Sequence, residues 1–326
     1  MDAFDHRSIG QRLDLFHFEE EQPGAVSWHP KGRMLRRQIE DCIRRRMKAA
    51  GFEAPRNPAC TVGRDDAHLL CRMDQVAAEV KRFSQLLRAV YRDFGFADFA
   101  VGLSTRPKER AGSEEIWDAA ERVLQGAARV AGLDYALQPG EGAPCGPKLE
   151  FILQDRLRRR WRCGTIQLDF VLPERPGTHY SDEDGAGAVP VVIRHAVLGS
   201  MERFIGMLLE HWQGRLPLWL APEQVLVAAV SDRFFGYAEE AAIQLEADGF
   251  RVAIDAGNET LADKIVGWRA RGIPILAVVG AREAEKARVN LRTLVDDVRA
   301  ELPLREAAGW IKRVAARSGA AATMPP

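Results

Sequence analysis

KLEFILQD, residues 148–155, opens the part of the sequence that decides the fold class, and WRCGTIQLDFVL (161–172) and VPVVIRHAVLG (189–199) follow it. Apolar and polar residues alternate in parts of each segment, which is the pattern of a strand with one buried face. The interval GTHYSDEDGAGA (177–188) is rich in turn residues and separates the last two segments. Strands in a row between helices predict an antiparallel sheet flanked by helices.

Amphipathic helices are predicted on the N-terminal side of these strands. Residues 33–50 place apolar side chains near helical spacing and stop at Gly51, the usual residue just past a helix end. A second helix is predicted over about 74–94, followed by the strand-like FADFAVGLSTRP (96–107). A third helix is predicted to begin at Ser113 and to end at Gly132.

The pattern changes near residue 216. Short apolar runs such as VLVAAV (225–230) and PILAVVG (274–280) then alternate with amphipathic helical segments. This alternation predicts an α/β unit with mostly parallel strands, in which a final basic and acidic segment leads into a terminal helix. We therefore predict a first domain over residues 1–215, a second over 216–317 and a disordered tail over 318–326.

Composition excludes several classes of protein. The 326 residues are 46% hydrophobic, which is enough for two domains with cores of their own. The 46 basic and 46 acidic residues balance, so the overall charge neither favours nor excludes a nucleic-acid partner. Five cysteines without a CxxC pair indicate a reducing compartment. No apolar run is long enough to span a membrane, so a cytoplasmic protein without membrane contact is expected.

Eight stretches form an ordered set of motifs along nearly the whole chain. They are DHRSIGQRLDLFHF (5–18), QPGAVSWHPKG (22–32), RDDAHLLC (64–71), GLSTRPKERAGSEEIWDAAE (102–121), QPGEGAPCGPKLEF (138–151), GTIQLDFVLP (164–173), IRHAVLGSMERFIG (193–206) and LWLAPEQV (218–225). Together they resemble threonyl-tRNA synthetase, a class II aminoacyl-tRNA synthetase. The resemblance implies a truncated α+β catalytic domain with an antiparallel sheet, an α/β anticodon-binding-like domain, and no N-terminal editing domain.

Class II motifs build the catalytic site in this family, and the resemblance places two of the three here. The first motif, at the dimer interface, corresponds to the helix from Arg33 and the strand to Pro58. It implies a homodimer, and a heterodimer with a complete synthetase stays open as an alternative. The third motif holds ATP and corresponds to Arg203, with Gln167 and Ser200 as further nucleotide contacts. A guanidinium suits this task because it offers several donors to phosphate oxygens.

The second motif, a hairpin whose arginine clamps the α-phosphate, has no room in this chain. Only ACTVGR (59–64) separates Pro58 from Asp65, where the family places the hairpin. We therefore expect a smaller catalytic sheet in which residues 59–64 form a short splice. In the family the same block carries a cysteine that ligates zinc, so its loss affects two functions together.

Zinc in this family is held by that cysteine and two histidines. His68 matches the first histidine and is the candidate metal ligand, whereas Arg194 stands at the position of the second. His195 is one residue away, but adjacent side chains on a strand point to opposite faces. We expect His68 to be hydrogen-bonded and metal-free. A rebuilt site that uses Cys60, Cys145 or His195 stays open.

Amino acid contacts are implied by three further positions. Asp66 and Lys148 match residues that contact the amino acid in the family. Cys145 stands where the family usually has an aromatic residue beside the amino acid. The pocket is therefore expected to be partly preserved, with a small-molecule amino acid and a nucleotide as its ligands.

Contacts to tRNA are implied by the second domain. Glu259 matches an acidic residue of the family's anticodon-binding domain, and Lys264 and Arg292 are candidates for backbone contacts. Ala229 replaces an asparagine and Val266 replaces a basic residue, so weakened anticodon reading is expected. Helical spacing places Trp268 in the core rather than on a base.

These observations leave three functions open. The first is a working ligase that activates threonine with ATP and charges tRNA. The second is a degenerate paralogue that keeps the fold and a pocket but binds, senses or regulates. The third is a module that binds RNA or a complete synthetase. The lost arginine and metal position favour the second, because one preorganised charge contact at a transition state is worth about a hundredfold in rate.

Overall fold

The computed structural model describes residues 5–19, 21, 25–52, 67–171, 180–181 and 187–317. They belong to two compact units, Met1–Cys42 with Gly206–Pro326, and Ile43–Ile205. The limits of these units fall inside two helices, α2 (Pro30–Ala49) and α5 (Met201–Trp212). The residues Pro58, Cys60 and Asp66, the splice 59–64 and the tail 318–326 lie outside the described residues.

A six-stranded sheet forms the centre of the unit Ile43–Ile205. Its strand order is β3-β10-β7-β6-β4-β5, and every neighbouring pair is antiparallel except β4 and β5. The prediction of an antiparallel sheet from the segments at 148, 161 and 189 is confirmed. The strands are β3 (Ala67–Cys71), β4 (Ala100–Ser104), β5 (Tyr135–Gln138), β6 (Lys148–Gln154), β7 (Arg160–Asp169) and β10 (Val191–Ala196), with a separate pair β8 (Tyr180–Ser181) and β9 (Gly187–Ala188).

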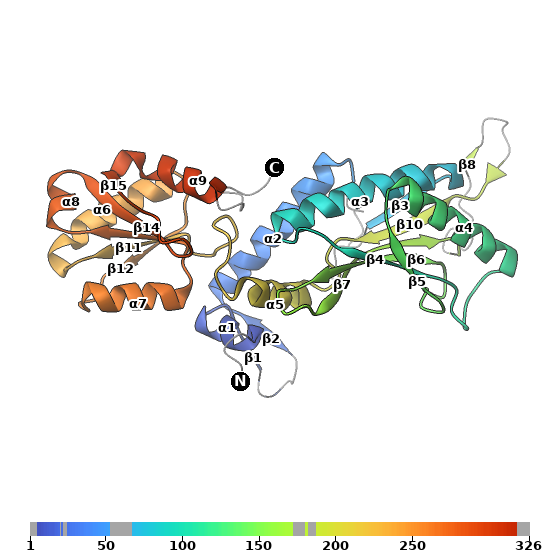
Figure 1. Cartoon of the computed structure of the whole chain (residues 1–326), viewed down its shortest axis with the longest axis horizontal. Coiled ribbons are helices and arrows are strands. Elements are labelled where there is room, and N and C mark those ends of the chain that lie inside the picture. Colours follow the sequence, from blue (N-terminus) through green and yellow to red (C-terminus); the bar gives the residue numbers. More distant parts are fainter. Residues whose placement is uncertain are drawn as a thin grey trace. The chain divides into compact units, whose positions relative to one another are not determined.

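Two helices of this unit, α3 (Val76–Asp93) and α4 (Glu114–Val130), pack on the sheet (Figure 1). A short 3₁₀ turn, Met73–Gln75, leads into α3. The Ser113 side chain caps α4 by accepting a hydrogen bond from the Ile116 backbone N–H, which satisfies one of the helix's free donors. From α3, the Tyr91 hydroxyl donates to the Val197 carbonyl at 2.7 Å and fixes the helix to the end of β10.

The unit that contains the C-terminal part is built on a five-stranded sheet of order β12-β11-β13-β14-β15. The strands β11 (Val225–Ala229), β12 (Val252–Asp255) and β13 (Ile275–Val279) are parallel, as their apolar runs predict. The last two, β14 (Arg288–Thr293) and β15 (Arg299–Pro303), are antiparallel. We did not predict these two strands, because charged residues interrupt their alternation.

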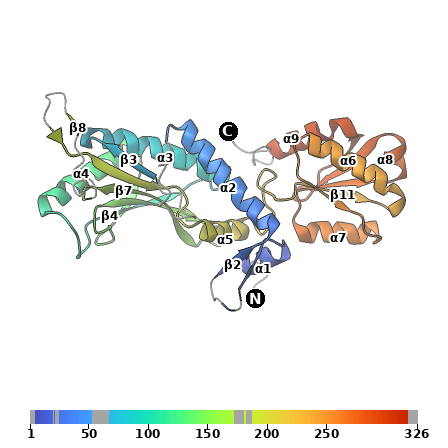
Figure 2. The same cartoon turned by 180° about the vertical axis from the view of Figure 1, so that it is seen from behind.

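Helices cover both faces of this sheet (Figures 1 and 2). The core on one face joins the sheet to α6 (Phe235–Ala247) and α9 (Ala307–Arg317). The core on the other face includes Trp268 from α7 (Leu261–Arg271). A short helix, α8 (Ala281–Glu285), precedes β14, and 3₁₀ turns lie at Asp232–Phe234 and Leu304–Glu306.

The same unit contains an N-terminal segment with one short helix, α1 (His6–Arg12), and an antiparallel pair, β1 (Phe16–Phe18) and β2 (Val26–Trp28). Helix α2 follows directly, and Gly51 beyond its end has φ of +74°, as expected for the residue just past a helix. Within the described ranges, no helix is long and apolar enough to cross a membrane.

Candidate functional site

A row of polar side chains runs across the six-stranded sheet. Lys148 on β6 is the register partner of Gln167 on β7, and Gln167 is the partner of Arg194 on β10. The row continues to Ser104 on β4 and to His68 on the edge strand β3. Register partners project from the same face of a sheet. The fold therefore gathers four residues singled out in the sequence, Lys148, Gln167, Arg194 and His68, on one face.

The adjacent row on the opposite face is buried. It includes Leu149, Ile166 and His195, which are register partners and at most 3% exposed. The His195 ring stacks on Phe83 of α3 with centroids 4.4 Å apart and meets the edge of Phe52 at 5.0 Å. This confirms that His195 and Arg194 point to opposite faces. His195 therefore cannot complete a metal site with His68.

The Lys148 end of the polar row is a compact ion pair. The Lys148 ammonium lies 2.9 Å from Glu150 Oε1, and the Ser104 hydroxyl donates to Glu150 Oε2 at 3.2 Å. Glu150 is only 4% exposed, so these partners must replace the water that its carboxylate loses on burial. Lys148 itself keeps 22% of its side chain exposed and can reach a ligand above the sheet.

Cys145 lies beside the centre of the row. The Gln167 amide donates to Cys145 Sγ at 2.9 Å. Burial, together with the neighbouring Asp169 carboxylate, raises the pKa of the Cys145 thiol. A raised pKa makes the free thiol a weaker nucleophile at neutral pH. The Cys145 sulfur is thus engaged by the Gln167 amide at the centre of the row.

Arg194 is loosely held. Its guanidinium lies 3.9 Å from Asp169 Oδ2, which is beyond hydrogen-bond distance, and 40% of its side chain is exposed. A guanidinium has no lone pair to offer a cation. Beside His68, Arg194 is therefore an unsuitable partner for zinc.

Metal-ligand clusters point the same way. Among the residues that the structure describes, one group of three histidine, cysteine or carboxylate donors lies within 4.8 Å, formed by Asp5, His6 and Glu210. That group belongs to the other unit. The residues described on the sheet thus do not fit the zinc that the resemblance implies.

Arg203 and Ser200 lie where β10 gives way to α5. The Arg203 backbone N–H is 3.3 Å from the Ser200 hydroxyl, and the guanidinium donates to the Arg162 carbonyl of β7 at 2.7 Å. Gly199 between strand and helix has φ of +76°, and an added Cβ there would lie 3.2 Å from the Cys163 carbonyl. This close turn brings Arg203 next to β7, which also carries Gln167.

The candidate tRNA residues do not form a single exposed surface. Glu259 is exposed just before Thr260, the residue that caps α7. Lys264 is 3% exposed, and its ammonium donates to the Ala229 carbonyl at 2.9 Å and lies 3.4 Å from Asp255 Oδ1. In this structure Lys264 therefore joins the ends of two strands, and its ammonium does not face solvent.

Arg292 and Trp268 lie near each other in the same unit. Arg292 pairs with Asp297, and its guanidinium carbon is 5.9 Å from the centre of the Trp268 ring. Trp268 is 1% exposed and donates from its indole nitrogen to the Ile273 carbonyl at 2.7 Å. The prediction that Trp268 packs in the core is confirmed.

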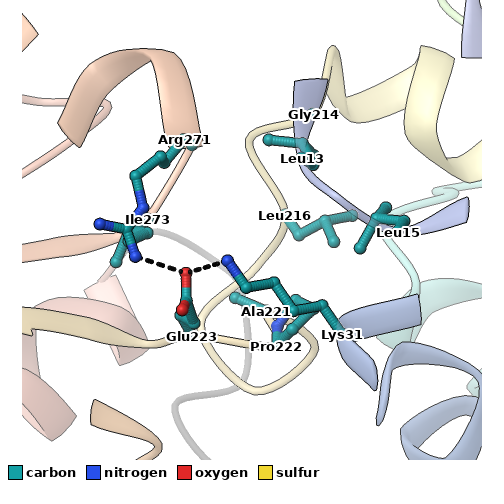
Figure 3. A pocket seen from close by; sticks show the side chains of 11 residues that line it. Leu13, Leu15, Lys31, Gly214, Leu216, Ala221, Pro222, Glu223, Arg271 and Ile273 are labelled. Carbon is teal, nitrogen blue, oxygen red and sulfur yellow. Dashed lines mark hydrogen bonds and ion pairs between the residues drawn. The ribbon is translucent and has the colours of Figure 1, made fainter. Parts of the chain in front are cut away.

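A small pocket beside the start of the five-stranded sheet was not predicted from the sequence. Figure 3 shows Glu223 reaching toward both Lys31 and Arg271, with each nitrogen 3.0 Å from Glu223 Oε2. The volume of this pocket, about 20 Å³, leaves room for little more than a water molecule. We therefore assign it a structural role, as an ion-paired triad that links three distant segments.

Family models match both parts of the chain. A model described as "tRNA synthetase class II core domain (G, H, P, S and T)" matches residues 61–212. A model described as "Anticodon binding domain" matches residues 224–314. The first includes all the described residues of the polar row and Arg203, and the second includes Glu259, Lys264 and Arg292.

The chain is similar to several threonine–tRNA ligases. The chain is 39% identical to that of Methylococcus capsulatus over 368 residues, which covers 89% of this chain and 58% of the relative. It is 39% identical to that of Caulobacter vibrioides, with 94% and 59% covered. The chain thus spans less than two thirds of these relatives. Because the first alignment is longer than this whole chain, the relative carries residues within the aligned span that this chain lacks.

Solved structures agree. The "RNA binding domain of Threonyl-tRNA synthetase" of Cryptosporidium parvum Iowa II has a TM-score of 0.80 and 30% identity, covering 94% of this chain and 97% of that one. A putative threonyl-tRNA synthetase of Aeropyrum pernix has a TM-score of 0.74 at 22% identity, covering 96% and 95%, and shows the shared fold.

Proposed function

Because the chain belongs to the threonyl-tRNA synthetase family of class II, we propose that it keeps the family's ligand-binding sheet but acts in binding or regulation and does not charge tRNA by itself. The ligands of this sheet are an amino acid and a nucleotide. Charging needs several charges placed in advance around the reacting phosphate. The residues on the sheet support binding better than they support this chemistry.

The observation that carries the proposal is the position of Arg194. It stands between His68 and Gln167 in register, where the resemblance implies the second zinc ligand. A guanidinium has no lone pair to offer zinc, and the nearby Cys145 sulfur is hydrogen-bonded by the Gln167 amide. The family's way of holding threonine through a metal is thus poorly supported here. The relative from Methylococcus capsulatus has residues within the aligned span that this chain lacks, which agrees with the loss of the hairpin that supplies the second ATP clamp.

Retained residues support nucleotide binding. The Arg203 side chain is exposed and anchored through the Arg162 carbonyl, and Gln167 lies on the same strand as Arg162. Ser200 supports the first turn of the helix that carries Arg203. We propose that ATP binds through these residues, with zinc playing no part.

A second candidate, a module that binds RNA or a complete synthetase, is favoured by the match of residues 224–314 to an anticodon-binding domain. Glu259 is exposed there, whereas Lys264 is buried, so tRNA binding is proposed to be weak. We propose that the chain forms a homodimer, as the resemblance implies, or a heterodimer with a complete synthetase. We propose a cytoplasmic location for the same reason.

The test is ATP–pyrophosphate exchange with threonine and with each other amino acid, on protein of measured zinc content. We expect no exchange with any amino acid from folded protein. An Arg203→Ala variant shows whether a signal comes from this site or from a contaminating synthetase. Exchange that depends on one amino acid and disappears in this variant would overturn the proposal and establish an active ligase.

A further inference from the structure

We propose that the polar row on the six-stranded sheet binds a small molecule with two anionic groups, one held by Arg194 and the other by Lys148. The inference rests on the proposed function, in which this face still binds a ligand. It adds the class of ligand, an amino acid with an anionic side chain.

The spacing of the two cations suits such a ligand. Arg194 and Lys148 are both register partners of Gln167, one on each neighbouring strand. Neighbouring strands are about 4.8 Å apart, so the two backbones lie roughly 10 Å from each other. The long side chains of arginine and lysine can bring their charges closer than this. Two anionic groups separated by a few bonds can therefore contact both cations at once.

Arg194 has hydrogen-bond donors available for a ligand. Among the residues that the structure describes, its charged neighbour within ion-pair distance is Asp169, at 3.9 Å. Arg106 offers a contrast, because its guanidinium contacts Glu121 and two further carboxylates of helix α4 and its pKa is raised by them. Arg106 is thus saturated by the fold, whereas Arg194 is exposed and loosely paired.

Two carboxylates beside the row, Glu150 and Asp169, are buried and hydrogen-bonded. Glu150 is 4% exposed and is bound by Lys148 and Ser104. Asp169 is 2% exposed and accepts a hydrogen bond from the Val171 backbone N–H at 3.0 Å. Among the described residues of the row, the partly exposed charges beside Gln167 are therefore the cations Arg194 and Lys148.

The hydroxyl of threonine can accept a hydrogen bond from this guanidinium but carries no charge to neutralise it. A site built for a charged partner discriminates strongly against a ligand that lacks the matching group. A carboxylate or phosphate would instead form charge-assisted hydrogen bonds with Arg194, which can be bidentate. We therefore expect the site to prefer anionic amino acids over threonine.

The chemistry allows two sources, a dicarboxylic amino acid or a phosphorylated one. Isothermal titration of the full chain with L-aspartate, L-glutamate, O-phospho-L-threonine, L-threonine and inorganic phosphate separates them. We expect an acidic or phosphorylated amino acid to bind about tenfold or more tightly than threonine. Which of these binds identifies the source.

Variants test the two contacts. Arg194→Gln keeps a polar side chain of similar reach and should weaken binding of the anionic amino acid by about tenfold or more. Arg288→Gln is the matched control, because Arg288 also lies on a strand and pairs with Glu301, but belongs to the other unit. The Arg288→Gln variant should bind the anionic amino acid as tightly as the unmodified chain does. Circular dichroism and the melting temperature of each variant establish that it is folded.

Three results would overturn the inference. They are equal affinity for threonine and the anionic amino acids, unchanged binding in Arg194→Gln, or inorganic phosphate binding as tightly as the best amino acid. The last would mean that a single anion is enough and that Lys148 adds nothing. These outcomes differ from pyrophosphate exchange with threonine, which would overturn the proposed function itself.

Discussion

Arg194 and His195 are neighbours in the chain, yet their side chains lie on opposite faces of the six-stranded sheet. Arg194 is 40% exposed on the polar face, and His195 is 3% exposed against Phe83. The alternation of β10 thus assigns one residue to the ligand face and the other to the core. In a family whose zinc site uses a histidine at this place, the order of these two residues decides whether a metal ligand is present.

This relationship predicts opposite responses to truncation. His195→Ala should lower the free energy of unfolding by about 2–4 kcal/mol, because it leaves a cavity beside a stacked ring. Arg194→Ala should change it by less than about 1 kcal/mol, since the residue is half-exposed and loosely paired. Urea denaturation of the two variants measures both values. Equal losses would show that Arg194 is a structural residue and would weaken its assignment to a ligand.

Zinc content gives a second prediction. The purified protein should contain less than one zinc per chain, and His68→Ala should leave the content unchanged, because Arg194, the register partner of His68, has no lone pair to offer a metal. Elemental analysis after dialysis measures this. Glu210→Gln serves as the control for metal held at Asp5, His6 and Glu210. Stoichiometric zinc that disappears in His68→Ala would disprove the metal-free interpretation.

Asp155 supplies a pH-dependent prediction. Burial alone would raise the pKa of its carboxyl, but hydrogen bonds from Trp161 and Arg159 outweigh burial and hold the pKa below its ordinary value. A lowered pKa in the folded state stabilises the protein above the unfolded-state pKa of about 3.9, and this contribution is lost as pH falls through the folded value.

We therefore expect Asp155→Asn to lower the free energy of unfolding by about 1–3 kcal/mol at pH 7. At pH 3 the difference between the variant and the wild type should be smaller. Urea titrations at both values measure it. Glu115→Gln is a useful comparison, since the pKa of this exposed carboxyl is also lowered, mainly by its hydrogen bond with Ser113. An undiminished difference at pH 3 would show that packing at Asp155, and not its charge, provides the stability.

The sequence predicted those features that depend on local spacing. Period-two alternation predicted that Arg194 and His195 point to opposite faces. Ser113 was expected at the start of a helix and occupies its cap, and the helical spacing of Trp268 predicted its burial. Features that depend on distant partners were beyond such reasoning. The row from Lys148 to His68 needs the strand register, and the pairing of Glu223 with Lys31 spans 192 residues of sequence.

Lys264 shows the same limit and gives the final prediction. The resemblance of its domain to an anticodon-binding domain made it a candidate for a tRNA backbone contact. The structure instead places its ammonium between the Ala229 carbonyl and Asp255, at the ends of β11 and β12. Lys264→Met should therefore destabilise the unit by about 1–3 kcal/mol, since it removes the donor that serves the Ala229 carbonyl and the partly buried Asp255 carboxylate.

Glu259→Ala, two residues before the start of α7, is the matched variant for RNA binding. Glu259 is exposed, so its loss should leave the melting temperature unchanged. Fluorescence titration with tRNA at several salt concentrations, alongside thermal unfolding, separates the two roles. If Lys264→Met keeps its stability but loses tRNA affinity and part of the salt dependence, Lys264 reaches a phosphate after all. If Lys264→Met instead lowers the stability of the protein, the ammonium holds the two strands together. Any tRNA contact then belongs to exposed residues such as Glu259.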